Sequence, residues 1–178
     1  TNANGGGFFA TSLESDALME EAQVAAAGFF GASDPHEVIF GPNMTSLTLK
    51  LSRALKTQWQ PGDEIILSSS EHDANFTPWV KAAESKGVVI KTIPLKQENC
   101  TLDQEAYLEL LGPKTKLVAV GLASNATGTI HPITQMAHAA HQVGAQFFVD
   151  AVHYAPHGLI DIEELGCDFL IASAYKFF

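Results

Sequence analysis

The sequence is poor in charged residues and in cysteine. Only 17% of its 178 residues are charged, against about 25% in a typical soluble domain, while 46% are hydrophobic. This balance excludes a disordered or collagen-like chain and predicts a large apolar core, an interface, or both. Cys100 and Cys167 are too few for a disulfide framework. We therefore expect a reduced, cytoplasmic chain in which both thiols are structural.

Basic residues are also scarce, since ten Lys and Arg stand against 20 Asp and Glu and give a net charge of −10. A nucleic-acid-binding face or a polybasic membrane patch needs clustered lysine and arginine. The longest apolar runs, such as residues 143–149, are too short and interrupted to span a bilayer. We expect neither a nucleic-acid partner nor a membrane.

Seven histidines raise the question of a metal site. His138 and His141 are three residues apart in a predicted helix, whereas Pro156 separates His153 from His157. A zinc site needs three or four converging ligands, and the sequence contains neither a Cys-x-x-Cys nor a His-Glu-x-x-His motif. We therefore expect no metal site.

Apolar segments of strand length alternate with amphipathic segments of helix length. Continuous apolar runs separated by helices are typical of a mostly parallel sheet covered on both faces, so we predict an α/β fold with three layers. The expected helices cover residues 11–30, 45–57, 75–86, 103–111, 132–143 and 162–165. The expected strands cover residues 37–40, 64–67, 88–93, 117–122, 146–149 and 168–172.

The first helix carries start and stop signals. Thr11 and Glu14 have the spacing of a capping box, and Gly31 follows the helix in the usual position of a terminating glycine. These signals predict that the helix begins near residue 11 and ends near residue 30.

Polar residues follow five of the predicted strands. Ligands of open parallel sheets bind in the crevice beyond the carboxyl ends of the strands. The strands are followed in turn by the turn Asn43-Met44-Thr45-Ser46, His72, Asn125, Asp150 and Lys176. This clustering is the strongest functional signal that the residues themselves offer.

Lys176 and Asp150 have two interpretations. A structural ion pair between them would satisfy a buried carboxylate. Alternatively they act separately, because a lysine amine forms a Schiff base with pyridoxal phosphate and an acidic residue keeps the pyridinium nitrogen protonated. The protonated ring then accepts electrons from the α-carbon of the substrate.

Three further features each have a functional and a structural interpretation. The turn before residue 45 leads into a helix N-terminus that favours a phosphate, although an N-cap role for Thr45 or Ser46 alone explains the same pattern. His72 either stacks on an aromatic ring or is a solvated loop residue. Asn125 either donates to a phenolate oxygen or is a left-handed turn residue before Gly128.

Four segments, taken in order and spacing, resemble the class V aminotransferase family, and most closely its cysteine desulfurase-like branch. They are SEHDAN (residues 70–75) with Pro78-Trp79, ASNATGT (123–129), FVDAVH (148–153) and DFLIASAYK (168–176). The resemblance covers essentially the whole chain. It implies the large domain of a fold type I transferase that depends on pyridoxal 5′-phosphate.

The resemblance implies catalytic roles for three residues. Lys176 matches the lysine that carries the cofactor as a Schiff base, Asp150 matches the partner of the pyridinium nitrogen, and His72 matches the histidine stacked on the ring.

Further residues match cofactor contacts. Thr45 and the Met44 backbone match the phosphate-binding turn, and Ser173 matches a hydroxyl that contacts the phosphate. Asn125 matches a residue near the phenolic oxygen and the substrate carboxylate.

The sequence departs from the family pattern at two cofactor positions. Tyr175 stands where the family commonly has histidine, and its hydroxyl can still donate to the phosphate. His153 stands where glutamine is common, and it can bond the phenolate side of the cofactor or act as an acid or base. Both changes indicate a divergent subfamily.

The resemblance also implies that residues 1–178 are an incomplete large domain whose C-terminal small domain is missing. Cys100, Cys167 and Arg53 match neither the family's nucleophilic cysteine nor its carboxylate-binding arginines. The parent protein is expected to be a homodimer that acts on an amino acid by sulfur removal, transamination or elimination. The alternative is a truncated, non-catalytic remnant or binding module.

Overall fold

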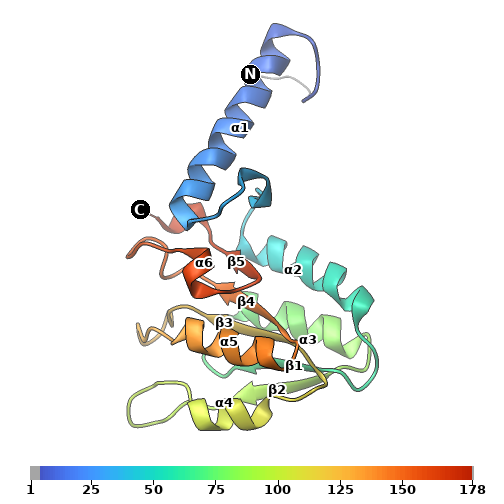
Figure 1. Cartoon of the computed structure of the whole chain (residues 1–178), viewed down its shortest axis with the longest axis vertical. Coiled ribbons are helices and arrows are strands. Elements are labelled where there is room, and N and C mark those ends of the chain that lie inside the picture. Colours follow the sequence, from blue (N-terminus) through green and yellow to red (C-terminus); the bar gives the residue numbers. More distant parts are fainter. Residues whose placement is uncertain (1–4, 178) are drawn as a thin grey trace. The chain divides into compact units, whose positions relative to one another are not determined.

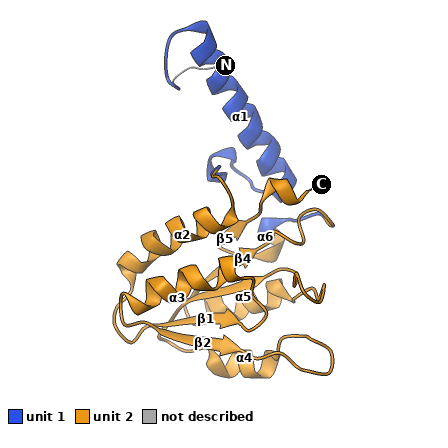
Figure 2. Cartoon of the chain, turned by 180° about the vertical axis from the view of Figure 1, so that it is seen from behind, with its two compact units in different colours: residues 1–40, 159–163 blue, residues 41–158, 164–178 orange. Residues whose placement is uncertain are grey.

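The computed structural model of the chain describes residues 5–177 (Figure 1). Residues 1–4 and 178 belong to the predicted domain but lie outside the described residues. The chain forms two compact units, distinguished by colour in Figure 2. Unit 1 takes in Thr1–Phe40 and Leu159–Glu163, and unit 2 takes in Gly41–Gly158 and Glu164–Phe178.

Unit 1 is built on one long helix, α1 (Ala10–Phe30). The predicted terminating glycine is confirmed, because Gly31 has a φ of 69° and its N–H donates to the carbonyl of Ala27. The predicted capping box is wrong. The helix already begins at Ala10, so Thr11 lies inside its first turn and Phe9 is the N-cap, without a side-chain bond.

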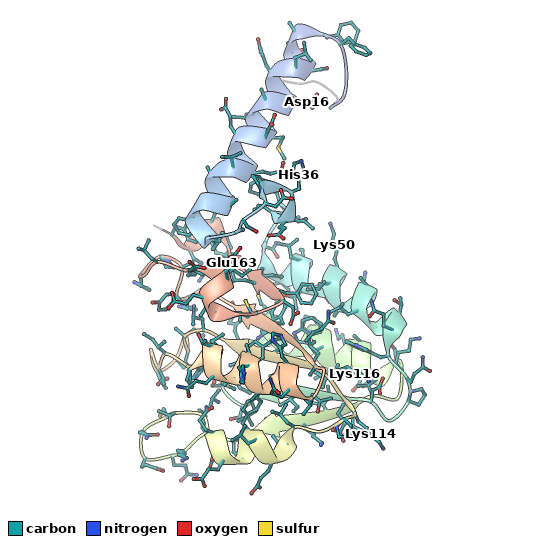
Figure 3. All side chains as sticks on the ribbon, in the orientation of Figure 1. Asp16, His36, Lys50, Lys114, Lys116 and Glu163 are labelled. Atoms are coloured by element: carbon teal, nitrogen blue, oxygen red, sulfur yellow. The ribbon has the colours of Figure 1, made fainter. Side chains whose placement is uncertain are left out.

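Two other parts of unit 1 differ from a simple helix. The glycine-rich start is tied to α1, since Gly6 N–H donates to Asp16 Oδ2 at 2.9 Å. Asp16 is labelled on this helix in Figure 3. The predicted strand over residues 37–40 is wrong. Pro35–Glu37 form the 3-10 turn η1, and the residues after it pair with no strand in the described part of the chain.

Unit 2 contains a five-stranded sheet. Its strands are β1 (Glu64–Ser68), β2 (Val89–Ile93), β3 (Thr115–Gly121), β4 (Gln146–Asp150) and β5 (Phe169–Ile171). They lie in the order β2-β1-β3-β4-β5, and every neighbouring pair is parallel. The predicted α/β fold is therefore confirmed, and each of these strands lies within two residues of its predicted range.

Helices cover both faces of the sheet (Figures 1 and 2). One face carries α2 (Met44–Leu55) and α3 (Thr77–Glu84), and the other carries α4 (Gln104–Leu110) and α5 (Ile133–Gln142). The remaining elements are the 3-10 helices η2 (Lys56–Gln58), η3 (Asp73–Asn75) and η4 (Ala174–Lys176) and the short α-helix α6 (Ile162–Leu165). No helix in the described residues is long and apolar enough to cross a membrane.

The helix predicted over residues 75–86 is shorter than expected. Residues 73–75 form η3, and α3 begins only at Thr77 with Pro78 in its first turn. Proline suits that position because the first helical N–H groups have no partner within the helix.

The central strands are buried on both sides, as a sheet between two helical layers requires. In β1 and β4, every residue after the first is buried. Leu117 and Phe148 pack with Trp79 of α3 in the core beneath α2 and α3. The rings of Trp79 and Phe148 meet edge to face, with centroids 5.1 Å apart.

The strand order creates a switch point between β1 and β3. From β1 the chain passes through α3 to β2 on one side, and then crosses to β3 on the other side of β1. The connection from β3 to β4 runs through α5, on the opposite face from α3. The segments that leave β1 and β3 therefore diverge, which opens a crevice at their carboxyl ends.

Candidate active site

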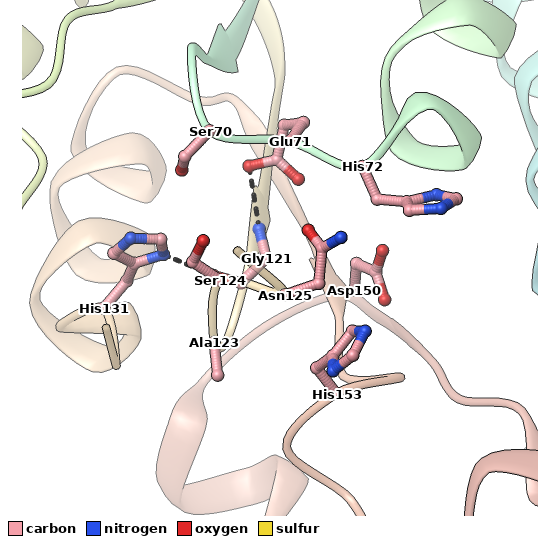
Figure 4. A pocket seen from close by; sticks show the side chains of 10 residues that line it. All are labelled: Ser70, Glu71, His72, Gly121, Ala123, Ser124, Asn125, His131, Asp150 and His153. Carbon is pink, nitrogen blue, oxygen red and sulfur yellow. Dashed lines mark hydrogen bonds between the residues drawn. The ribbon is translucent and has the colours of Figure 1, made fainter. Parts of the chain in front are cut away.

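A hollow lies at this switch point, with a volume of about 270 Å³ that includes the part open to solvent. Side chains beyond three strand ends line it (Figure 4). They are Ser70, Glu71 and His72 after β1, Gly121, Ala123, Ser124, Asn125 and His131 from β3 onward, and Asp150 and His153 from β4 onward.

The hollow brings together four of the nine predicted cofactor residues, namely His72, Asn125, Asp150 and His153. The other five lie outside its lining, at the N-terminus of α2 and after β5. They are Met44, Thr45, Ser173, Tyr175 and Lys176.

Asp150 ends β4 at the hollow, with only 8% of its surface exposed. Its Oδ1 accepts a hydrogen bond from Val152 N–H at 3.0 Å. Burial raises the pKa of Asp150, and the Val152 N–H and the nearby charges of His72 and His153 oppose this rise. The carboxyl group is thus buried and faces two histidines.

The alternative ion pair between Lys176 and Asp150 does not form in the described residues. The Lys176 side chain is exposed, and its Nζ lies 5.6 Å from the centroid of the Tyr175 ring. Among residues 5–177, no carboxylate pairs with the lysine.

His72 and Asn125 face the hollow from the loops after β1 and β3 (Figure 4). His72 is the N-cap of η3, and its Nδ1 accepts a hydrogen bond from Ala74 N–H at 3.1 Å, which fixes the ring. The left-handed alternative for Asn125 is wrong. Among the described residues, Cys100 is the one non-glycine residue with a positive φ.

The N-terminus of α2 is joined to the segment after β5. Met44 N–H donates to Ser173 Oγ at 3.1 Å, and Ser173 is buried. Asn43 is the N-cap, because its Oδ1 accepts from Ser46 N–H at 2.9 Å, so the alternative of Thr45 or Ser46 as N-cap is wrong. Neither the Ser173 hydroxyl proton nor the Thr45 N–H has a partner in the part of the chain that the structure describes, so both can bond a ligand.

Two ionisable residues of the lining were not predicted as site residues. Glu71 lies in the same motif as His72, and an acid three residues beyond a buried strand is a signal that could have marked it. His131 is 4% exposed, and its Nδ1 donates to the carbonyl of Gly121 at 2.7 Å. Its Nε2 has no partner among the described residues, and burial lowers its pKa. No spacing in the sequence marks His131.

A family model described as aminotransferase class-V matches residues 2–178. The chain belongs to the class V aminotransferase family. The predicted resemblance is confirmed, and members of this family depend on pyridoxal phosphate and act on amino acids.

Individual class V relatives agree with this membership. The chain is 40% identical to the aminotransferase-like protein FGM3 of Gibberella zeae, over 99% of this chain and 44% of that protein. It is 31% identical to a cysteine desulfurase of Dickeya dadantii, over 97% of this chain and 42% of that enzyme. The chain thus spans less than half the length of these relatives.

Solved class V structures share the fold. The cysteine desulfurase CsdA of Escherichia coli matches with a TM-score of 0.86 and 29% identity, covering 98% of this chain and 44% of that one. The apo cysteine desulfurase of Thermococcus onnurineus matches with a TM-score of 0.92 and 29% identity, covering 99% and 44%. These structures confirm the resemblance to the desulfurase-like branch.

Proposed function

We propose that this chain is part of the pyridoxal-phosphate-binding large domain of an enzyme that acts on an amino acid. The observation that carries the proposal is Asp150, a buried carboxyl group at the hollow with no ion-pair partner among the described residues. A buried carboxylate needs a cationic or hydrogen-bonding partner. The protonated ring nitrogen of the cofactor would be that partner.

The other donors and acceptors fit the same ligand. A phosphate group needs several donors, and the α2 N-terminus supplies the Thr45 N–H, its hydroxyl and the positive end of the helix dipole. The Ser173 hydroxyl and the Tyr175 hydroxyl would add to these donors. His72 would cover one face of the ring, and Asn125 and His153 would bond its phenolic oxygen.

When bound, pyridoxal phosphate supplies a sink for the electrons released at the substrate α-carbon. Asp150 would keep the ring nitrogen protonated. Lys176 would hold the cofactor covalently, and its free amine would then move a proton at the α-carbon as a general base. His72 would exclude water from the ring face that it covers.

The reaction is proposed as sulfur removal, transamination or elimination, carried out by a homodimer of the whole protein. The cysteine desulfurases among the relatives and neighbours favour sulfur chemistry. Cys167 does not suit the nucleophile, because burial raises its pKa to about 12 and the reactive form is the thiolate. The alternative, a truncated, non-catalytic remnant or binding module, predicts a chain that keeps the fold without turnover.

Asp150→Asn tests the proposal, because asparagine keeps the shape of the side chain but removes its charge. We expect the ring nitrogen of bound pyridoxal phosphate to be protonated in the wild-type chain at neutral pH and unprotonated in the variant. The affinity of the variant for pyridoxal phosphate should fall by no more than about tenfold, the equivalent of one hydrogen bond. The protonation state is measured by ¹⁵N NMR with ring-labelled cofactor.

Asp73→Asn is the matched control, since Asp73 is an exposed carboxylate in the loop that carries His72. It should leave the ring nitrogen protonated. A ring nitrogen that stays protonated in Asp150→Asn would rule out the role proposed for Asp150. Absence of binding to the wild-type chain would favour the remnant.

A further inference from the structure

Glu71 lies immediately before His72, and its carboxyl group accepts hydrogen bonds from three elements. The donors are the Ser68 hydroxyl at the end of β1, Asn75 Nδ2 in η3 at 2.6 Å and Gly121 N–H at the end of β3 at 2.9 Å. The carboxyl group therefore ties the loop that carries His72 to both strands of the switch point.

These contacts require two acceptor oxygens. The Trp79 indole N–H can only donate, and it donates to Asn75 Oδ1 at 2.9 Å, so the amide N–H₂ of Asn75 must face Glu71. Gly121 N–H can likewise only donate. In a glutamine at position 71, one of the two oxygens is replaced by an N–H₂ group. That group would face either the Asn75 N–H₂ or the Gly121 N–H, so two donors would meet without an acceptor. The position thus selects a carboxyl group and not merely a polar side chain.

A chain of hydroxyls leads from this carboxyl group to the hollow. Ser68 Oγ bonds Glu71 Oε1 and lies 3.1 Å from Ser70 Oγ, and Ser70 lines the hollow (Figure 4). A hydroxyl both donates and accepts. A proton on Glu71 Oε1 can therefore pass to Ser68 while the Ser68 proton passes to Ser70 and the Ser70 proton to water.

Acidic and basic groups surround Glu71. Burial, with a smaller contribution from the charge of Asp150 at the end of β4, raises the pKa of Glu71 to about 7, although its three hydrogen-bond donors oppose the rise. His72, His131 and His153 are the other titratable groups that line the hollow. A change of charge on Glu71 therefore changes the electrostatic potential at Asp150.

We propose that Glu71 is a positioning residue of the candidate active site. The hydrogen bonds that its carboxyl group accepts form a clamp, which holds the loop that places His72. Proton exchange through Ser68 and Ser70 changes the charge beside Asp150. The part of this inference that concerns the cofactor rests on the proposed function. The clamp and the proton exchange belong to the chain itself.

Trp79 provides a reporter that needs no cofactor, because its indole N–H is linked to Glu71 through Asn75 and is one of only two indoles in the chain. In ¹H–¹⁵N NMR spectra of the 178-residue chain, assigned with Trp59→Phe, we expect the Trp79 resonance to shift with a midpoint near pH 7. Glu71→Gln should abolish this shift. Glu84→Gln, on the exposed side of α3, should leave it unchanged.

Ser68→Ala is the second variant, and it retains the carboxyl group. Because the Ser68 hydroxyl stabilises the charged form of Glu71, its loss should move the midpoint to higher pH. A midpoint that is the same in wild type and Glu71→Gln would overturn the assignment. An unchanged or lower midpoint in Ser68→Ala would overturn the role of the hydroxyl chain.

The free energy of unfolding should depend on pH through the same titration of Glu71. The pKa of Glu71 rises from its ordinary value of 4.5 to about 7 in the folded chain, so the folded chain holds the proton more tightly than the unfolded chain. This contribution is complete below pH 4.5 and is lost as the pH rises through 7. The difference in urea midpoint between wild type and Glu71→Gln should change across this window. A constant difference would contradict the assignment.

A separate measurement tests the link to His72. With pyridoxal phosphate added, Glu71→Gln should weaken binding about tenfold relative to Glu84→Gln, the equivalent of one hydrogen bond, and should reduce the circular dichroism induced in the bound cofactor. Equal binding and dichroism in the two variants would contradict positioning. If the wild-type chain does not bind the cofactor, the proposed function fails, while the Trp79 titration still decides the role of Glu71.

Discussion

Replacing Lys176 with alanine is expected to abolish covalent attachment of pyridoxal phosphate and to leave the fold intact. Attachment requires an amine that condenses with the cofactor aldehyde, and alanine has none. Lys176 follows β5, whose Ile171 pairs with Asp150 of β4, so the lysine lies just beyond the strand next to the candidate site. Its side chain is exposed, and its removal costs no buried contact. The measurement is the visible absorbance that remains with the protein after gel filtration.

Lys81→Ala is the control, because Lys81 is an exposed lysine on α3. It should retain the same absorbance as the wild-type chain. Equal absorbance in the Lys176→Ala and wild-type chains would show that another amine carries the cofactor.

Phe148→Ala is expected to lower the free energy of unfolding by about 3–5 kcal/mol, the cost of emptying a fully buried aromatic site. Phe148 is fully buried in β4 and meets the ring of Trp79 edge to face. The cavity would also loosen Trp79, which holds Asn75 against Glu71. Urea denaturation followed by far-UV circular dichroism measures the loss.

Leu108→Ala is the matched control, since Leu108 is 58% exposed on α4. An exposed position away from caps and networks should change stability by no more than about 0.5 kcal/mol. Similar small losses in both variants would contradict a core built on Phe148.

The strands were predictable from the sequence where a short run of apolar residues is long enough to be buried as a strand. The runs at residues 65–67 and 147–149 are apolar without alternation, and both lie in buried strands of a parallel sheet. Residues 38–40 are equally apolar, yet Ile39 is 76% exposed and no strand pairs with them in the described residues. Strand formation depends on a partner strand, which a local pattern does not contain.

Part of the candidate site was predictable for a topological reason. Parallel strands bring their carboxyl ends to one edge, so His72, Asn125 and Asp150 meet there whatever the details of their loops. His131 is different, because its contact with the carbonyl of Gly121 depends on the turn that pairs Ala123 with Ile130 and brings the chain back to the end of β3. The place of the Lys176 side chain over Tyr175 likewise follows from no sequence pattern.

The most direct test is to trap the cofactor on the 178-residue chain. The chain is incubated with pyridoxal phosphate, reduced with borohydride, digested and mapped by mass spectrometry. We expect a yellow chromophore before reduction and one reduced adduct, on Lys176. No adduct, or labelling spread evenly over exposed lysines such as Lys50 and Lys81, would contradict the account.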